Sequence, residues 1–75
     1  MQSYLMSPFY QILDPINMKV LALRRKKSVK PLTDQQKKAA QSLLDQLQEL
    51  SKNASNSTES DFAGECVEDA RKLLA

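Results

Sequence analysis

The sequence predicts an all-α protein, a small three- or four-helix unit built on a C-terminal antiparallel helical hairpin. Residues 33–52 and 60–74 both carry apolar side chains at helical spacing, and the polar segment 53–60 separates them. A chain of 75 residues allows one domain. We therefore expect residues 1–75 to fold as a single unit, with 1–7 frayed and 53–60 forming a mobile loop.

The N-terminal part of the chain contains two proline-marked helix signals. Ser7 and Pro8 predict the start of a short helix over 8–13, and Asp14 should end it, because a residue that precedes proline disfavours the helical conformation. Pro15 then opens a second predicted helix that reaches about Lys27. Alternating apolar residues leave a strand over 15–27 as the alternative.

The C-terminal hairpin has clearer boundaries. Thr33 and Gln36 form the pattern of a capping box, which predicts a helix from there to about Lys52. Ser60 is the expected cap of the last helix, since Asp61 follows it in the first turn. The predicted core of the whole unit comprises Phe9, Ile12, Leu13, Ile16, Val20, Leu23, Leu43, Leu44, Leu47, Leu50, Phe62, Cys66, Val67, Ala70, Leu73 and Leu74.

Several kinds of chemistry lack the residues that they need. The chain has no histidine, one glycine and one cysteine, so it offers no histidine base, no glycine-rich phosphate loop and no intramolecular disulfide. Cys66 lies in the middle of an apolar helical face, which favours a buried small hydrophobe over a reactive thiol. We therefore expect no enzyme activity, no cofactor, no metal site and no small-molecule substrate.

The net charge of +2 conceals a strong asymmetry along the chain. Residues 15–38 carry eight basic side chains against one acid, whereas residues 39–75 carry three against seven. The densest basic cluster comprises Arg24, Arg25, Lys26, Lys27 and Lys30. It could bind phosphates, form a solvated helix end or act as a nuclear localisation signal, and the sequence does not separate these three readings.

The N-terminus offers a different kind of surface. Tyr4, Leu5, Phe9 and Tyr10 are apolar or aromatic residues that a small core need not absorb, so they are candidates for contact with a partner. The alternative is that Phe9 and its neighbours cap the end of the bundle. A short core without a disulfide or metal also makes a partner chain the remaining source of added stability.

These observations favour a small non-catalytic adaptor or regulatory protein that acts by protein–protein contact, including contact with a second copy of itself. An inhibitor or immunity-type protein shares the same physics. The alternative is a nucleic-acid-binding accessory protein that uses the basic cluster at 24–30. No apolar run is long enough to span a bilayer, and the basic residues cluster in sequence instead of lining one helical face opposite bulky apolar groups. We therefore expect no membrane association. A single unpaired cysteine and the absence of a signal-peptide pattern suggest the cytoplasm, or the nucleus in a eukaryote.

Overall fold

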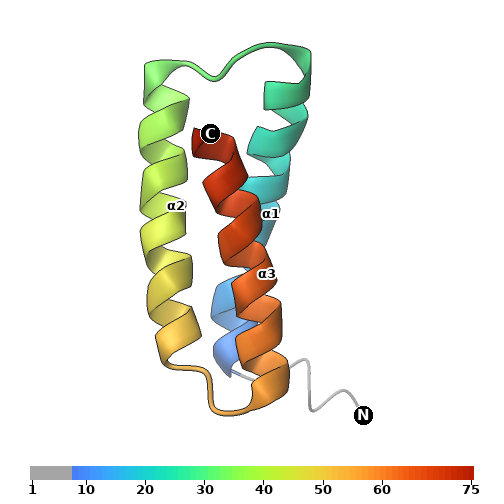
Figure 1. Cartoon of the computed structure of the whole chain (residues 1–75), viewed down its shortest axis with the longest axis vertical. Helices are drawn as coiled ribbons and strands as arrows, with labels where there is room; N and C mark the ends of the chain where they lie inside the picture. Colours follow the sequence, from blue (N-terminus) through green and yellow to red (C-terminus); the bar gives the residue numbers. More distant parts are fainter. Residues whose placement is uncertain (1–7) are drawn as a thin grey trace.

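The computed structural model describes residues 8–75, which form three helices. These are α1 (Pro8–Val29), α2 (Asp34–Lys52) and α3 (Ser57–Leu74). The chain runs up through α1, down through α2 and up again through α3, and each helix packs against the other two (Figure 1). The all-α prediction is confirmed, and so is the antiparallel hairpin, which α2 and α3 form.

One continuous helix, α1, replaces the two helices predicted at the N-terminus. The predicted break at Asp14 is wrong, because Pro15 lies inside α1. A proline in a helix interior costs about 3 kcal/mol, but Leu13 and Ile16 on either side of it are both buried on the face that packs against α2 and α3. Pro15 itself is exposed, so the core holds the helix together across it. The alternative of a strand over 15–27 is also wrong.

The start of α2 agrees with its local sequence. The Gln36 backbone N–H donates to the Thr33 hydroxyl oxygen at 3.1 Å, and the Thr33 backbone N–H donates to Gln36 Oε1 at 2.9 Å. Both hydrogen bonds of the capping box are therefore present. Asp34 in the first turn and Lys52 in the last turn match the helix dipole.

The start of α3 differs from the prediction. Asn56, not Ser60, caps this helix, and its side chain accepts a hydrogen bond from the Glu59 backbone N–H at 2.9 Å. The buried Glu59 carboxylate in turn accepts from the backbone N–H and the hydroxyl of Ser55, at 3.0 and 2.9 Å. These contacts extend the helix by one turn, so the loop predicted over 53–60 is reduced to 53–56.

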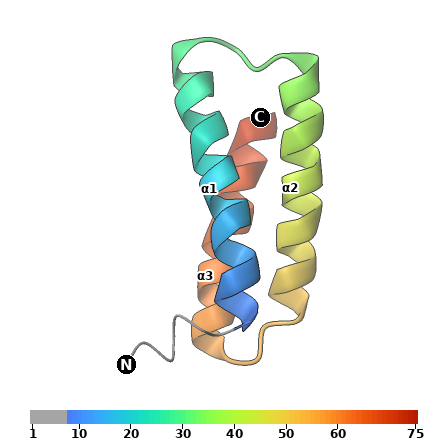
Figure 2. The ribbon, with the colours of Figure 1, turned by 180° about the vertical axis from the view of Figure 1, so that it is seen from behind.

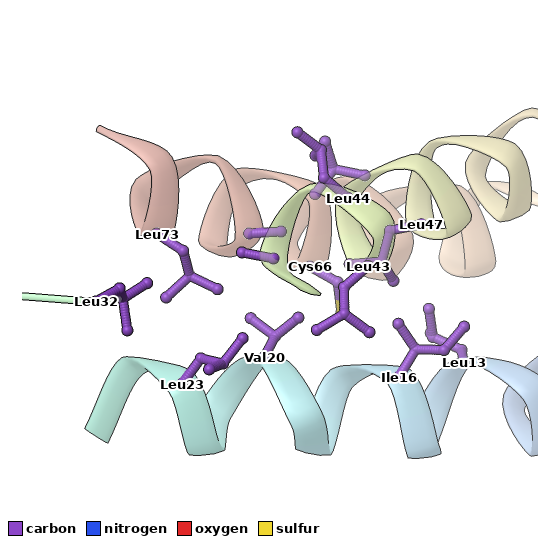
Figure 3. Packing of buried hydrophobic residues seen from close by; sticks show 13 residues of the cluster. Leu13, Ile16, Val20, Leu23, Leu32, Leu43, Leu44, Leu47, Cys66 and Leu73 are labelled. Atoms are coloured by element: carbon purple, nitrogen blue, oxygen red, sulfur yellow. The ribbon is translucent and has the colours of Figure 1, made fainter. Parts of the chain in front are cut away.

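The core lies along the axis between the three helices, as Figure 3 shows for its leucines, Val20 and Cys66. The predicted core wrongly included Ile12 and omitted three buried residues, Leu32, Ala40 and Ala63. Ile12 is 53% exposed, because it lies beside the buried face that Leu13 occupies. Leu32 in the α1–α2 connection was not predicted, yet it is buried and closes the core near Leu73. The predicted residues Phe9, Leu50, Phe62 and Leu74 are partly buried against the cluster.

Candidate partner-binding surface on α1 and α2

Of the four N-terminal residues predicted to face a partner, the structure describes only two. Tyr4 and Leu5 lie outside the described residues. Phe9 and Tyr10 are partly buried in the first turn of α1, and their rings meet edge to face with centroids 5.3 Å apart. Tyr10 also contacts the ring of Phe62 in α3, with centroids 6.0 Å apart. These two rings therefore pack at the end of the bundle where α1 and α3 begin, and partner contact through them stays a prediction.

Two members of the basic cluster contact α3. Lys27 Nζ donates to the main-chain oxygens of Lys72 at 2.6 Å, Ala75 at 3.2 Å and Leu73 at 3.4 Å. A lysine in this position satisfies carbonyls that a helix leaves unpaired at its C-terminus and favourably meets the negative end of the helix dipole. Arg24 pairs with Asp69 of α3 at 3.6 Å, where both side chains are partly exposed.

The other three members of the cluster lie together at the upper end of α1. Arg25, Lys26 and Lys30 are exposed, and with Val29 and Gln36 they line one pocket beside the α1–α2 connection. The structure therefore brings three of the five predicted phosphate-binding residues to one place. The side-chain oxygen of Gln36 accepts from the Thr33 backbone N–H, so Gln36 can offer this pocket only its amide N–H donors.

A groove runs between α1 and α2, which lie side by side in front of α3 in Figure 2. Its floor is apolar, because Leu23 and Leu43 reach it from the core. Lys19 and Lys26 stand on the α1 side, and no carboxylate is among the residues that line it. The full lining comprises Lys19, Ala22, Leu23 and Lys26 from α1, and Ala39, Ser42, Leu43 and Gln46 from α2.

Exposed apolar side chains are concentrated on α1, a feature that sequence reasoning missed. Among residues 8–75, the large hydrophobic side chains that are exposed all belong to this helix: Val29 (83%), Met18 (70%), Ile12 (53%) and Leu21 (38%). The signal was present in the sequence, because α1 carries apolar residues all round rather than on one stripe. The expected break at Asp14 hid it by dividing the helix into two short segments.

Cys66, the one cysteine of the chain, is buried in the core and is 2% exposed. Burial raises the pKa of its thiol to about 11, and the negative charges of Asp69, Glu65 and Asp14 act in the same direction. The thiol is therefore protonated at neutral pH and inaccessible. In the described part of the chain, no group of three or more cysteine or acidic residues could hold a metal ion, and no helix is long and apolar enough to cross a membrane.

The fold and this surface together define a three-helix bundle with a basic, apolar-floored groove on one face. Comparison with family models, curated proteins and solved structures found no match to this chain.

Proposed function

We propose that this protein is a small non-catalytic adaptor or regulator that binds another protein through α1 and the groove that α1 forms with α2. The observation that carries the proposal is the uneven exposure of apolar side chains in the described residues. Met18 and Val29 are largely exposed on α1, whereas α2 and α3 expose no large hydrophobic residue. Fully burying such a side chain against a partner contributes about 1.5–3 kcal/mol, so α1 is the helix that gains most from protein contact.

Under this proposal the partner contacts α1 and the α1–α2 groove rather than the N-terminal aromatics. Phe9 and Tyr10 already pack against each other and Phe62, so they have less area left to offer a partner. The unpaired Cys66 is consistent with a reducing compartment, and we propose a cytoplasmic or nuclear setting on that basis.

Nucleic-acid binding is the second candidate function. It is supported by the three exposed cations at the C-terminal end of α1, with Lys19 about two to three turns before them. The case for nucleic-acid binding is weakened because Arg24 and Lys27 are already engaged with α3. Fewer free cations mean fewer phosphate contacts, and residues 15–61 contain no aromatic side chain on which a base could stack.

Site-specific photo-crosslinking in the source cells tests the proposal. A photoreactive amino acid at Met18 should yield a defined protein adduct that resists nuclease. The same amino acid at Asp45, which is exposed on α2 away from the groove, is the matched control and should yield none. Equal adducts from both positions, or none from Met18, would contradict the proposal. An adduct that nuclease destroys would support the second candidate instead.

A further inference from the structure

We infer that the partner contributes an amphipathic α-helix with acidic side chains beside its apolar stripe, and that this helix lies lengthwise in the α1–α2 groove. The inference rests on the proposed function and specifies its partner. A helix laid into an apolar groove is a common mode of peptide recognition. Docking here would place a fourth helix against α1 and α2, on the face opposite α3 (Figure 2).

The groove is long enough for a short helix. It adjoins the pocket at the C-terminal end of α1, because Lys26 lines both. From Lys19 to Val29 the rise along α1 is about 15 Å, which corresponds to about three turns of a bound helix. Ala22 and Ala39 stand on opposite sides of the floor, and such small side chains let another helix approach closely.

The charges around the groove select an acidic occupant. The two adjoining pockets together are lined by Lys19, Arg25, Lys26 and Lys30 and by no carboxylate. The outer surface of α3 has the opposite character, with four carboxylates against one lysine, Lys72, in one shallow pocket: Asp61, Glu65, Glu68 and Asp69. An acidic helix is therefore attracted to α1 and α2 and repelled by α3, which fixes the face on which it docks.

A second copy of this chain fits the groove less well. Its α1 would supply apolar side chains, but it would also bring a second set of lysines against the first. Its α3 would supply carboxylates, but the acidic pocket there is lined by polar residues and Gly64 and offers no large apolar side chain for the floor. The chain thus presents complementary charge and complementary apolar area on different helices, whereas the groove requires both from one.

Nucleic acid would match the positive charge of this surface but not its apolar area. Phosphates match the lysines, but they leave the apolar floor and the exposed Val29 of the adjoining pocket without a counterpart. An acidic amphipathic helix matches the charge and the apolar area at the same time. We therefore treat nucleic-acid binding as one of the outcomes that would overturn the inference.

A pair of probe peptides tests the inference on the intact protein. Both are helix-forming, about four turns long and share one leucine stripe, but one carries glutamates beside the stripe and the other carries lysines. We expect the glutamate peptide to bind, with amide NMR shifts confined to α1 and α2 around Lys19, Lys26 and Ser42. The lysine peptide should bind at least about tenfold more weakly, and added salt should weaken the glutamate complex.

Charge reversal in the protein provides the matched variants. Lys19→Glu with Lys26→Glu should invert the preference between the two peptides. Lys37→Glu with Lys38→Glu makes the same change in net charge on exposed α2 positions that do not line the groove, so it should preserve the preference. Circular dichroism of each variant checks that the fold is retained.

Four results would overturn the inference: no binding of either peptide at millimolar concentration, equal affinity for both, shifts that map to α3, or displacement of the glutamate peptide by a DNA duplex at equal concentration. The proposed function fails separately. A nuclease-resistant protein adduct at Met18, combined with no preference for the glutamate peptide, would retain the protein contact and refute the acidic helix.

Discussion

Replacing Lys27 with methionine should destabilise the bundle by about 1 kcal/mol, because this side chain closes the C-terminal end of α3 from another helix. Its ammonium group lies 2.6 Å from the Lys72 oxygen and 3.2 Å from the Ala75 oxygen. Methionine keeps most of the aliphatic stem, so the change removes the charge and the donors while it retains most of the packing.

The magnitude follows from two contributions. Hydrogen bonds to a charged group contribute about 1.5–3 kcal/mol when they are well shielded, and a cation at a helix C-terminus contributes about 0.3–1 kcal/mol. Two of the three contacts are exposed to solvent, which screens them, so we expect a net loss below this combined range, of about 1 kcal/mol. For a domain of this size, a loss of 1 kcal/mol lowers Tm by about 4–8 °C.

Thermal unfolding followed by circular dichroism measures the effect, with Lys26→Met as the matched control. Lys26 is the neighbouring lysine, it is exposed, and no contact with α3 is shown for it, so the control removes the same charge from the same turn of α1. We also expect faster amide hydrogen exchange in the last turn of α3 in Lys27→Met alone. If both variants melt at the same temperature, the lysine does not act as a cap and this reasoning is wrong.

Three further predictions concern single positions in the helices. Gly64→Ala should raise the stability by about 1 kcal/mol, since an added Cβ meets no atom within 4 Å and alanine favours the helix; an unchanged midpoint in chemical denaturation would refute this. Asn17→Leu should also stabilise the fold, by about 1 kcal/mol, because Oδ1 of Asn17 is buried and no donor within the described residues reaches it; a lower Tm would show that the oxygen is satisfied. Cys66 should resist alkylation at pH 8 in the folded protein and react once it is unfolded. Burial raises the pKa of the Cys66 thiol from the ordinary 9.0 to about 11, so the contribution of the buried thiol to stability should be complete below pH 9 and be lost as the pH rises towards 11. Chemical denaturation of the protein and of Cys66→Ala at several pH values measures this loss.

The parts of the fold that the sequence predicted well are those that local contacts decide. The capping box of α2 needs only Thr33 and Gln36, three residues apart, and it forms as expected. The apolar spacing of α2 and α3 is likewise a short-range pattern, and it predicted both the hairpin and most of the core. Leu32 could not be predicted in the same way, because its burial depends on two helices meeting above an irregular connection.

The helix break predicted at Asp14 does not occur, because tertiary packing overrides a local signal there. A proline in the chain is a strong helix-ending signal, and the sequence offers a plausible cap beside it. The continuous α1 results from the burial of Leu13 and Ile16 on one face across the proline, and that benefit exists only once α2 and α3 are in place. Tertiary packing thus outweighed a local preference of about 3 kcal/mol.

The basic cluster divides for a related reason. In the sequence it is one block, yet successive residues of a helix point about 100° apart. Arg24 and Lys27 are three residues apart and both reach α3, whereas Arg25, Lys26 and Lys30 line the pocket beside α2. The side of α1 on which α3 packs determines which of the five cations remain free. The packing of all three helices in the core determines that side.

The same asymmetry links the thin core to the proposed partner. The three-helix core buries one face of α1 and leaves Met18 and Val29 exposed to water. This exposure adds neither stability nor solubility to the free protein. A helix in the groove would complete a four-helix arrangement, and it would stabilise the fold by mass action. At a free concentration one hundred times its Kd, a ligand that binds only the folded state adds about 2.7 kcal/mol. For a core that supplies about 3–5 kcal/mol, this addition is comparable to the stability of the bundle itself. Under the proposed function, the apolar floor of the groove is one half of a larger core, and the apolar stripe of the partner helix would be the other half.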